Sequence, residues 1–298
     1  MKKLLLGLVV IFALSSCNIE EDNDDCPVGV VNISVYVERF GSRQISTNIP
    51  ASSESNFNTR INSLNYYLYR GDELIEGGPA LETRASAATR DFSWSDLAKG
   101  DYTLVLMANC AESLLREAPI SPSSYTIVYP GADNTDDYFL ESFSFTVDSD
   151  EEKNYIAQLK RVHGIVRCTL TNVPVEVSQI QMELNSLASH SCVTGAYSEG
   201  HSVRKVLDMS VRSRAENSEI SFTILTFPTM DDMTTSWNMT LATPAGNAYD
   251  GTITEGLYVA RNEMLDLAAD FDGEVTYSVN IKTEWDGDTG SDAVEINN

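Results

Sequence analysis

Apolar and polar positions alternate in short runs along the first half of the chain. Val31, Ile33, Val35 and Val37 are separated by single polar or aromatic residues, and this period of two is typical of a strand with one buried face. Further strands are predicted at residues 64–69, 74–75, 92–94, 101–109, 125–129 and 139–147, with a turn at residues 70–73 and one helical turn at residues 114–117. The first half is therefore predicted to consist of β-strands and turns.

The second half of the chain repeats this opening. Residues 162–170 form an apolar run, and Ile180, Met182 and Leu184 share one face of the next predicted strand. Later strands are predicted at residues 220–227, 237–241 and 275–285, with a hairpin turn at residues 244–247. No segment keeps a helical period for more than about ten residues. The predicted fold class is therefore all-β, in its simplest form two β-sandwiches.

A charged segment, residues 148–153, separates the two strand-rich halves. Domain boundaries usually fall in exposed polar linkers, so we place the boundary shortly after this segment. The predicted organisation is an N-terminal β-sandwich over residues 26–157 and a C-terminal β-sandwich over residues 158–298.

Residues 1–17 have the features of a lipoprotein signal peptide. A basic start, residues 1–3, precedes an apolar segment, residues 4–14, that is too short to span a bilayer. The segment Leu14–Cys17 resembles the lipobox of bacterial lipoproteins, in which cleavage leaves an acylated cysteine. Cys17 is therefore the predicted lipidation site. Its acyl chains, palmitate among them, are expected to hold the protein in the outer membrane, facing the cell exterior.

Charge narrows the choice of partners. The acidic tether at residues 18–25 resembles the surface-export signal of Bacteroidetes lipoproteins, although a flexible solvated linker would have the same composition. In the whole chain 44 acidic residues outnumber 20 basic ones, which gives a formal net charge of −24. Such a chain has no basic groove for phosphates, so nucleic acid is excluded as a partner and electrostatic docking on anionic lipid is disfavoured.

Four cysteines remain besides Cys17, an even number in an exported chain where disulfides can persist. They are Cys26, Cys110, Cys168 and Cys192. Three pairings are open. If each domain keeps its own disulfide, Cys26 pairs with Cys110 and Cys168 pairs with Cys192, and the alternative is that the thiols are free and buried.

The residues that carry catalysis or bind metals form no recognisable motif. The three histidines, His163, His190 and His201, lack metal-ligand spacing. No serine lies in a G-x-S-x-G motif, and the segment Asp286–Asp292 lacks the glutamate that completes a calcium loop. The chain is therefore predicted not to be an enzyme and to use no metal or cofactor.

Aromatic side chains have two explanations, stacking on sugars or filling the core of a sandwich. Those at issue are Tyr66, Tyr67, Tyr69, Trp94, Trp237 and Trp285. Aromatics at alternating strand positions are more often core, and we favour that explanation.

Several short segments, in this order and spacing, resemble the fimbrillin-associated anchor subunits of Bacteroidetes fimbriae, the minor or anchor fimbrial lipoproteins. Besides the lipobox and acidic tether they are Cys26-Pro27, residues 97–105 followed by Ala108-Asn109, Leu159-Lys160-Arg161, residues 259–267 and Trp285-Asp286. The resemblance implies two tandem transthyretin-like β-sandwich domains. It also implies an anchor or accessory subunit of an adhesive fimbria, or pilus, whose partners are the stalk or tip subunits and, through the assembled fimbria, a host surface or glycan.

The same resemblance implies how subunits dock. In related stalk subunits, proteolysis after an arginine removes the first strand, and a strand from a neighbour fills the groove by β-strand addition. Arg39, Arg43 and Arg60 lie where such a cut would fall, but anchors are expected to keep this strand. Docking is then predicted to use an exposed β-edge. The candidate edge is the first strand, with Val31, Ile33, Val35 and Val37.

The tail of the chain is a weak candidate for a donor strand. It is acidic and glycine-rich after Trp285, apart from the segment 293–296. A second function remains open beside the fimbrial one, because a glycan-binding surface lipoprotein would also be built from β-sandwiches and carry aromatic residues.

Overall fold

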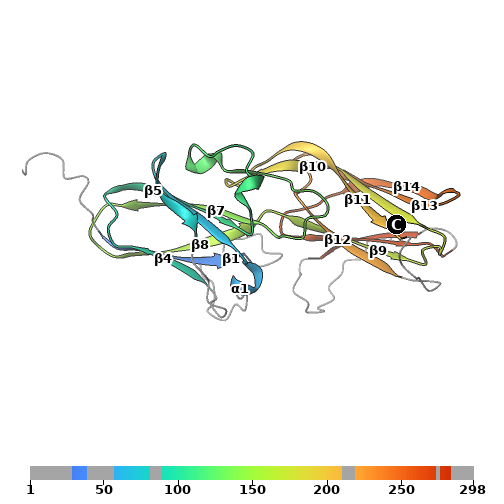
Figure 1. The fold of residues 1–298 in the computed structure, drawn as a ribbon, viewed down its shortest axis with the longest axis horizontal. Helices are drawn as coiled ribbons and strands as arrows, with labels where there is room; N and C mark the ends of the chain where they lie inside the picture. Colours follow the sequence, from blue (N-terminus) through green and yellow to red (C-terminus); the bar gives the residue numbers. More distant parts are fainter. Residues whose placement is uncertain (1–28, 39–56, 81–88, 210–218, 273–275, 283–298) are drawn as a thin grey trace, which may run out of the picture.

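The computed structural model of the 298-residue chain describes residues 29–38, 57–80, 89–209, 219–272 and 276–282. Two lobes lie end to end along the long axis of the molecule, each built from two layers of β-strands (Figure 1). Among the described residues, the helices are the single turn α1 (Phe57–Arg60) and two 3₁₀ turns, η2 (Glu112–Leu114) and η3 (Pro122–Ser124). The predicted all-β fold class is confirmed. In the described ranges, no helix is long and apolar enough to cross a membrane.

The N-terminal lobe contains seven strands in one continuous path. They are β1 (Val31–Val37), β2 (Leu64–Arg70), β3 (Glu73–Pro79), β4 (Arg90–Trp94), β5 (Gly100–Ala108), β7 (Phe139–Val147) and β8 (Lys153–Arg161). The order β3-β2-β5-β7 forms one layer and β4-β1-β8 the other. The layers meet at one corner, where Phe139 and Leu140 pair with Arg161 and Lys160.

The C-terminal lobe contains one sheet in the order β11-β10-β13-β14 and a second in the order β12-β9-β15-β16. Its strands are β9 (Gly164–Thr171), β10 (Gln179–Cys192), β11 (Tyr197–Asp208), β12 (Ile220–Thr226), β13 (Thr235–Thr243), β14 (Gly246–Leu257), β15 (Met264–Asp270) and β16 (Thr276–Lys282). The short strand β6 (Thr126–Val128) leaves the N-terminal lobe between β5 and β7 and pairs with β10.

The two lobes repeat one topology. The orders β3-β2-β5-β7 and β4-β1-β8 recur as β11-β10-β13-β14 and β12-β9-β15. In both lobes the first strand pairs in parallel with the last strand of the shared topology, β1 with β8 and β9 with β15. The predicted repeat of the opening of the first half is therefore confirmed. The strand β16 is an addition to the C-terminal lobe, with no counterpart among the described strands of the other lobe.

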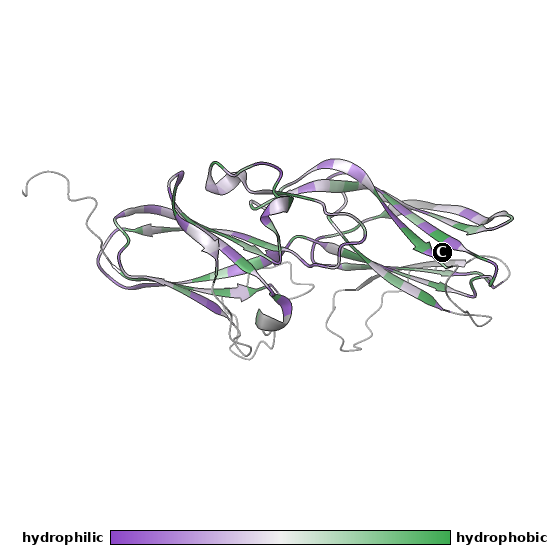
Figure 2. Cartoon of the chain, in the orientation of Figure 1, coloured by the Kyte–Doolittle hydropathy of each residue, from purple (hydrophilic) through white to green (hydrophobic). Residues whose placement is uncertain are grey.

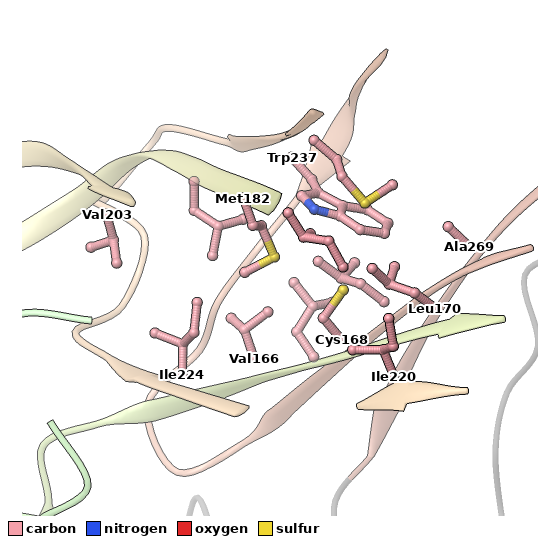
Figure 3. Packing of buried hydrophobic residues seen from close by; sticks show 14 of the residues in the cluster. Val166, Cys168, Leu170, Met182, Val203, Ile220, Ile224, Trp237 and Ala269 are labelled. Atoms are coloured by element: carbon pink, nitrogen blue, oxygen red, sulfur yellow. The ribbon is translucent and has the colours of Figure 1, made fainter. Parts of the chain in front are cut away.

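Hydrophobic and hydrophilic residues alternate along the strands of both lobes (Figure 2), and the buried apolar side chains form a core cluster in each lobe. In β1 the four residues Val31, Ile33, Val35 and Val37 are buried, and the residues between them are partly exposed. In the C-terminal lobe Cys168 lies among Val166, Leu170, Met182 and Trp237 (Figure 3). The aromatic residues were correctly predicted as core where they are fully buried, at Tyr69, Trp94 and Trp237.

The strand predictions are confirmed for segments with clear alternation, and four strands were not predicted. Those four are β8, β11, β14 and β15. The predicted boundary between residues 157 and 158 falls inside β8, which pairs with β1 along Val31–Val37. The chain changes lobe at Val162–His163 instead, because residues 148–152 of the charged segment are only the turn between β7 and β8, and Lys153 already belongs to β8. The predicted last strand exists as β16, while Trp285 lies outside the described residues.

Candidate functional site

The first strand is an interior strand of its sheet. Residues Val31–Val35 pair antiparallel with β4, and Val31–Val37 pair in parallel with β8. Both rows of backbone groups are therefore used over most of the strand. This corrects the prediction of an open edge at Val31, Ile33, Val35 and Val37. The alternation of these residues shows that one face of the strand is buried. It does not show whether other strands pair with its two edges.

The residue that follows β1 connects it to the other lobe. Glu38 is 5% exposed, and its carboxylate accepts hydrogen bonds from Arg261 Nη1 at 2.5 Å and Nη2 at 3.0 Å. It also accepts the backbone N–H of Arg161 at 3.1 Å. A bidentate arginine–carboxylate pair fixes both distance and orientation. Glu38 therefore attaches the end of β1 to the turn that precedes β15.

A second arginine continues this network at the junction of the lobes. Arg161 ends β8 and is 2% exposed. Its Nε donates to Asp137 at 2.7 Å, and its Nη1 donates to Asn262 at 2.5 Å. Because the Arg161 guanidinium is withdrawn from water, losing the Asp137 carboxylate would leave a buried charge uncompensated. We call Glu38, Asp137, Arg161, Arg261 and Asn262 the junction network.

His163 lies beside the junction network and is fully buried. The backbone N–H of Tyr138 donates to His163 Nδ1 at 3.3 Å, and the ring stacks on Phe227 with centroids 5.3 Å apart. Burial lowers the pKa of His163, and the nearby Asp137 carboxylate opposes this effect. The imidazole is therefore held neutral as part of the packing between the lobes.

An apolar cluster completes the junction. It contains Val105, Met107 and Leu140 from the N-terminal lobe, Ala188 and Phe227 from the C-terminal lobe, and Tyr125 and Ile127 from the segment that carries β6. This segment lies where the two lobes meet (Figure 1). Since one cluster takes residues from both lobes and from the crossing strand, the junction resembles the interior of a protein more than a flexible linker.

The motif Ala108-Asn109 has a structural explanation. Asn109 adopts a positive φ of 57° after β5. Its side-chain oxygen accepts the N–H of Asn62 at 2.7 Å, and its amide donates to the carbonyls of Arg60 and Asp137. Asparagine tolerates this conformation and can satisfy several backbone groups at once. The motif therefore ties the end of β5 to α1 and to the start of β7.

The last strand of the N-terminal lobe leaves one side open. In the described part of the chain, β8 pairs with β7 only at Lys160 and Arg161, so nothing pairs with Lys153–Leu159 on the side away from β1. Ile156 is 53% exposed on this stretch. Phe143 of β7 and Tyr155 of β8 are only partly buried, and their rings pack edge to face with centroids 5.6 Å apart. This stretch combines unpaired backbone with exposed apolar surface.

The cysteines do not bridge the described strands. Cys110, Cys168 and Cys192 are free thiols, which corrects the suggested pairing of Cys168 with Cys192. Cys168 is enclosed in the core of the C-terminal lobe, whereas Cys192 ends β10 and contacts the Thr126 hydroxyl at 3.2 Å. Burial raises the pKa of the Cys110 thiol to about 12. A thiol in this state is protonated and unreactive.

The remaining predicted site residues are dispersed. Cys17, Cys26, Arg39 and Arg43 lie outside the described residues. Arg60 ends α1 and donates to the carbonyl of Glu38 at 3.3 Å. His190 and His201 lie on the neighbouring strands β10 and β11.

The junction network was not identified from the sequence. Two of the short segments quoted above, Leu159-Lys160-Arg161 and residues 259–267, supply its arginines. The pairing of Arg261 with Glu38 spans 223 positions, which no local pattern can report. An isolated acid directly after an alternating strand was the only available signal.

Comparisons with known proteins agree with this geometry. The model of a protein family described as "Fimbrillin-A associated anchor proteins Mfa1 and Mfa2" matches residues 23–298. A sequence comparison with curated proteins finds no significant match.

Solved structures with a similar fold include proteins of Porphyromonas gingivalis and Bacteroides thetaiotaomicron. The fimbrial anchor protein Mfa2 of Porphyromonas gingivalis superposes with a TM-score of 0.54 at 12% identity, over 86% of this chain and 98% of that one. A candidate adhesin of Bacteroides thetaiotaomicron gives 0.57 at 11% identity, over 88% and 98%. A candidate polysaccharide-binding protein of the same species gives 0.56 at 8% identity, over 86% and 96%. At these identities the likeness shows the fold.

Proposed function

The chain belongs to the family of fimbrillin-A-associated anchor proteins, and from this premise we propose that it is a surface lipoprotein that serves as an anchor or accessory subunit of an adhesive fimbria. The family match carries the proposal, because it covers both lobes and the junction between them. The resemblance of residues 1–17 to a lipoprotein signal supports attachment to the outer membrane through Cys17.

The interior position of β1 supports a place at one end of the fimbria. A subunit that lacks its own strand at this position can accept one from a neighbour by β-strand addition. Here the position is filled by Val31–Val37, which pairs with β4 and β8 and is held at its end by Glu38. A chain that fills this position itself terminates such a series of exchanges. Docking to stalk subunits would then use another edge.

Retention of fimbriae on cells tests the proposal. Deletion of the gene should release fimbriae into the medium, and the wild-type gene should restore attachment. Cys17→Ala should leave the protein folded but release it from the membrane fraction, because the acyl anchor is lost. Unchanged attachment of fimbriae in the deletion strain would contradict the fimbrial role. A Cys17→Ala protein that stays with membranes after a high-salt wash would contradict the anchor.

Glycan binding is the second candidate function. A hollow of about 400 Å³ is lined by Asn62, Ser63 and Asn65 together with Ile61, Leu64, Pro79 and Ala80, and amide and hydroxyl groups beside apolar surface suit a sugar. One structural neighbour is described as a candidate polysaccharide-binding protein. Affinity electrophoresis in gels that contain polysaccharide would decide: retardation that Asn65→Ala removes would favour this function over the fimbrial one.

A further inference from the structure

The last strand of the shared topology has different neighbours in the two lobes. In the C-terminal lobe the last shared strand, β15, is covered along Met264–Asp270 by the antiparallel strand β16. Its counterpart β8 has no such cover over Lys153–Leu159 within the described residues. The outer sides of β3 and β11, and of β4 and β12, are open in both lobes over the described strands. The difference therefore lies specifically at β8.

The direction of the backbone groups of β8 follows from its contacts with β1. Lys153 donates its N–H to the carbonyl of Val30, and Leu159 accepts the N–H of Glu38. In a parallel ladder both groups of a residue point to the same side, and the side alternates from one residue to the next. Odd-numbered residues of β8 therefore face β1. Asn154, Ile156 and Gln158 point their N–H and C=O groups toward the open side.

The apolar surface beside this row lacks complete cover. Ile156 is 53% exposed on the outer face, and Tyr155 and Phe143 are only partly buried on the inner face. The inner residues Ala157 and Leu159 of β8 are 3% and 0% exposed, as buried as Leu265, Leu267 and Ala269 of β15 at 3%, 1% and 2%, so the incomplete cover is confined to Tyr155, Ile156 and Phe143. A strand added to β8 would place alternate side chains beside Tyr155 and Phe143 and bury them.

We propose that the open side of β8 is the docking edge for an extended strand supplied by a neighbouring fimbrial subunit, bound antiparallel as β16 is bound to β15. This inference rests on the proposed function and names the surface that performs it. The partner strand needs apolar residues at alternate positions and a neutral or basic net charge. A second copy of this chain is disfavoured as the donor, since two chains of net charge −24 repel each other.

Two substitutions at one residue test the edge. Ile156→Pro removes an N–H donor from the open side while the ladder to β1 keeps its odd-numbered donors. Ile156→Lys places a charge at the edge, which is how natural sheets discourage strand addition. Ile75→Lys is the matched control, because Ile75 is 45% exposed on the edge strand β3. Each full-length variant is titrated against a purified fimbrillin-type stalk subunit from the same organism, and thermal melting verifies folding.

The proposal predicts that both Ile156 variants bind the subunit at least about tenfold more weakly than wild type, while Ile75→Lys binds normally. Equal binding by wild type and both Ile156 variants would overturn the docking edge and leave the fimbrial role in place. No binding by the wild type would overturn the proposed function itself. Self-association that Ile156→Pro abolishes would overturn the choice of partner in favour of a second copy.

Discussion

The parallel pairs β1–β8 and β9–β15 hold the same place in two lobes of the same topology, yet their surroundings differ. β15 is covered by β16 on its outer side, whereas β8 is open over Lys153–Leu159 in the described chain. In contrast, β1 is held at its end by a residue pair that reaches the other lobe. The comparison indicates that the N-terminal lobe retains its first strand firmly and offers its last strand to a partner.

Breaking the ladders of β1 is expected to have the largest effect. Val35→Pro should lower the free energy of unfolding by about 3 kcal/mol or more, because Val35 is fully buried and its N–H group belongs to the ladder with β4. Ile156→Pro is the matched control on the open side of β8 and should cost much less. Thermal melting of both variants provides the measurement. A Val35→Pro protein that melts like wild type would show that β1 is not an interior strand in solution.

Removing the charge of Glu38 should have the next largest effect. Glu38→Gln leaves Arg261 without its carboxylate and should cost about 2–3 kcal/mol, because the Glu38 side chain is 6% exposed and water reaches the Arg261 side chain only in part, at 29% exposure. Arg167→Gln is the control. This substitution breaks the bidentate pair between Arg167 and Asp266 inside the C-terminal lobe. Because the Arg167 side chain is 35% exposed, the loss should cost about 0–1 kcal/mol.

Urea denaturation measures both values, and amide exchange locates the effect. Glu38→Gln should speed exchange in β1 and in the turn around Arg261, on both sides of the junction. Arg167→Gln should leave β1 unchanged. If the two variants lose equal stability and β1 exchanges at the wild-type rate in both, Glu38 does not hold β1.

A smaller effect is expected from filling the close approach at the start of β9. A Cβ at Gly164 would lie 2.3 Å from the carbonyl oxygen of Ala260, a backbone atom that cannot rotate away. Gly164→Ala should therefore destabilise the protein by about 1–3 kcal/mol. Gly195→Ala is the control, because Gly195 has a positive φ but open space around it. The stability that this variant loses measures backbone strain without a clash. Equal melting temperatures for wild type and Gly164→Ala would mean that the junction is looser than described.

The smallest expected effect is a pH dependence from His163. Burial lowers its folded-state pKa below the ordinary 6.5, so the unfolded chain binds a proton more readily. The contribution of His163 to the free energy of unfolding is fully present above pH 6.5 and is lost as the pH falls from there toward the folded-state pKa. The total loss is about 1 kcal/mol for each unit by which the pKa is lowered. His163→Gln should flatten this part of the curve between pH 7.5 and 5.5 (about one unit on either side of the ordinary value). An unchanged slope in the variant would assign it to other groups.

Local patterns predicted the strands whose two faces differ most. β1, the β2–β3 hairpin, β5 and β13 have clean alternation or long apolar runs, and they were identified. β8 was missed because it starts within a charged segment and mixes Lys153, Tyr155 and Ile156 on different faces. β15 was noted only as a short motif, although Leu265, Leu267 and Ala269 alternate with Asp266 and Asp270 as in a strand with one buried face.

The candidate site depended on relations that sequence patterns do not carry. Whether β1 is an edge or an interior strand is decided by β4 and by β8, which lie far along the chain. The open side of β8 becomes visible only when it is compared with β15 and β16. The burial of alternate residues in β1 was predicted correctly, because successive residues of a strand point to opposite faces and a period of two therefore indicates one buried face. The neighbours of a strand are set by long-range packing.

Residue-resolved amide hydrogen exchange of β8 and β15, with and without the fimbrillin-type subunit, tests the central claim most directly. In the free chain the amides of Asn154, Ile156 and Gln158 should exchange faster than those of Tyr155 and Ala157, whose N–H groups face β1. On addition of the subunit the three fast amides should become protected while β15 stays unchanged. If the subunit binds and the β8 amides exchange as before, the account of β8 as the docking edge is wrong.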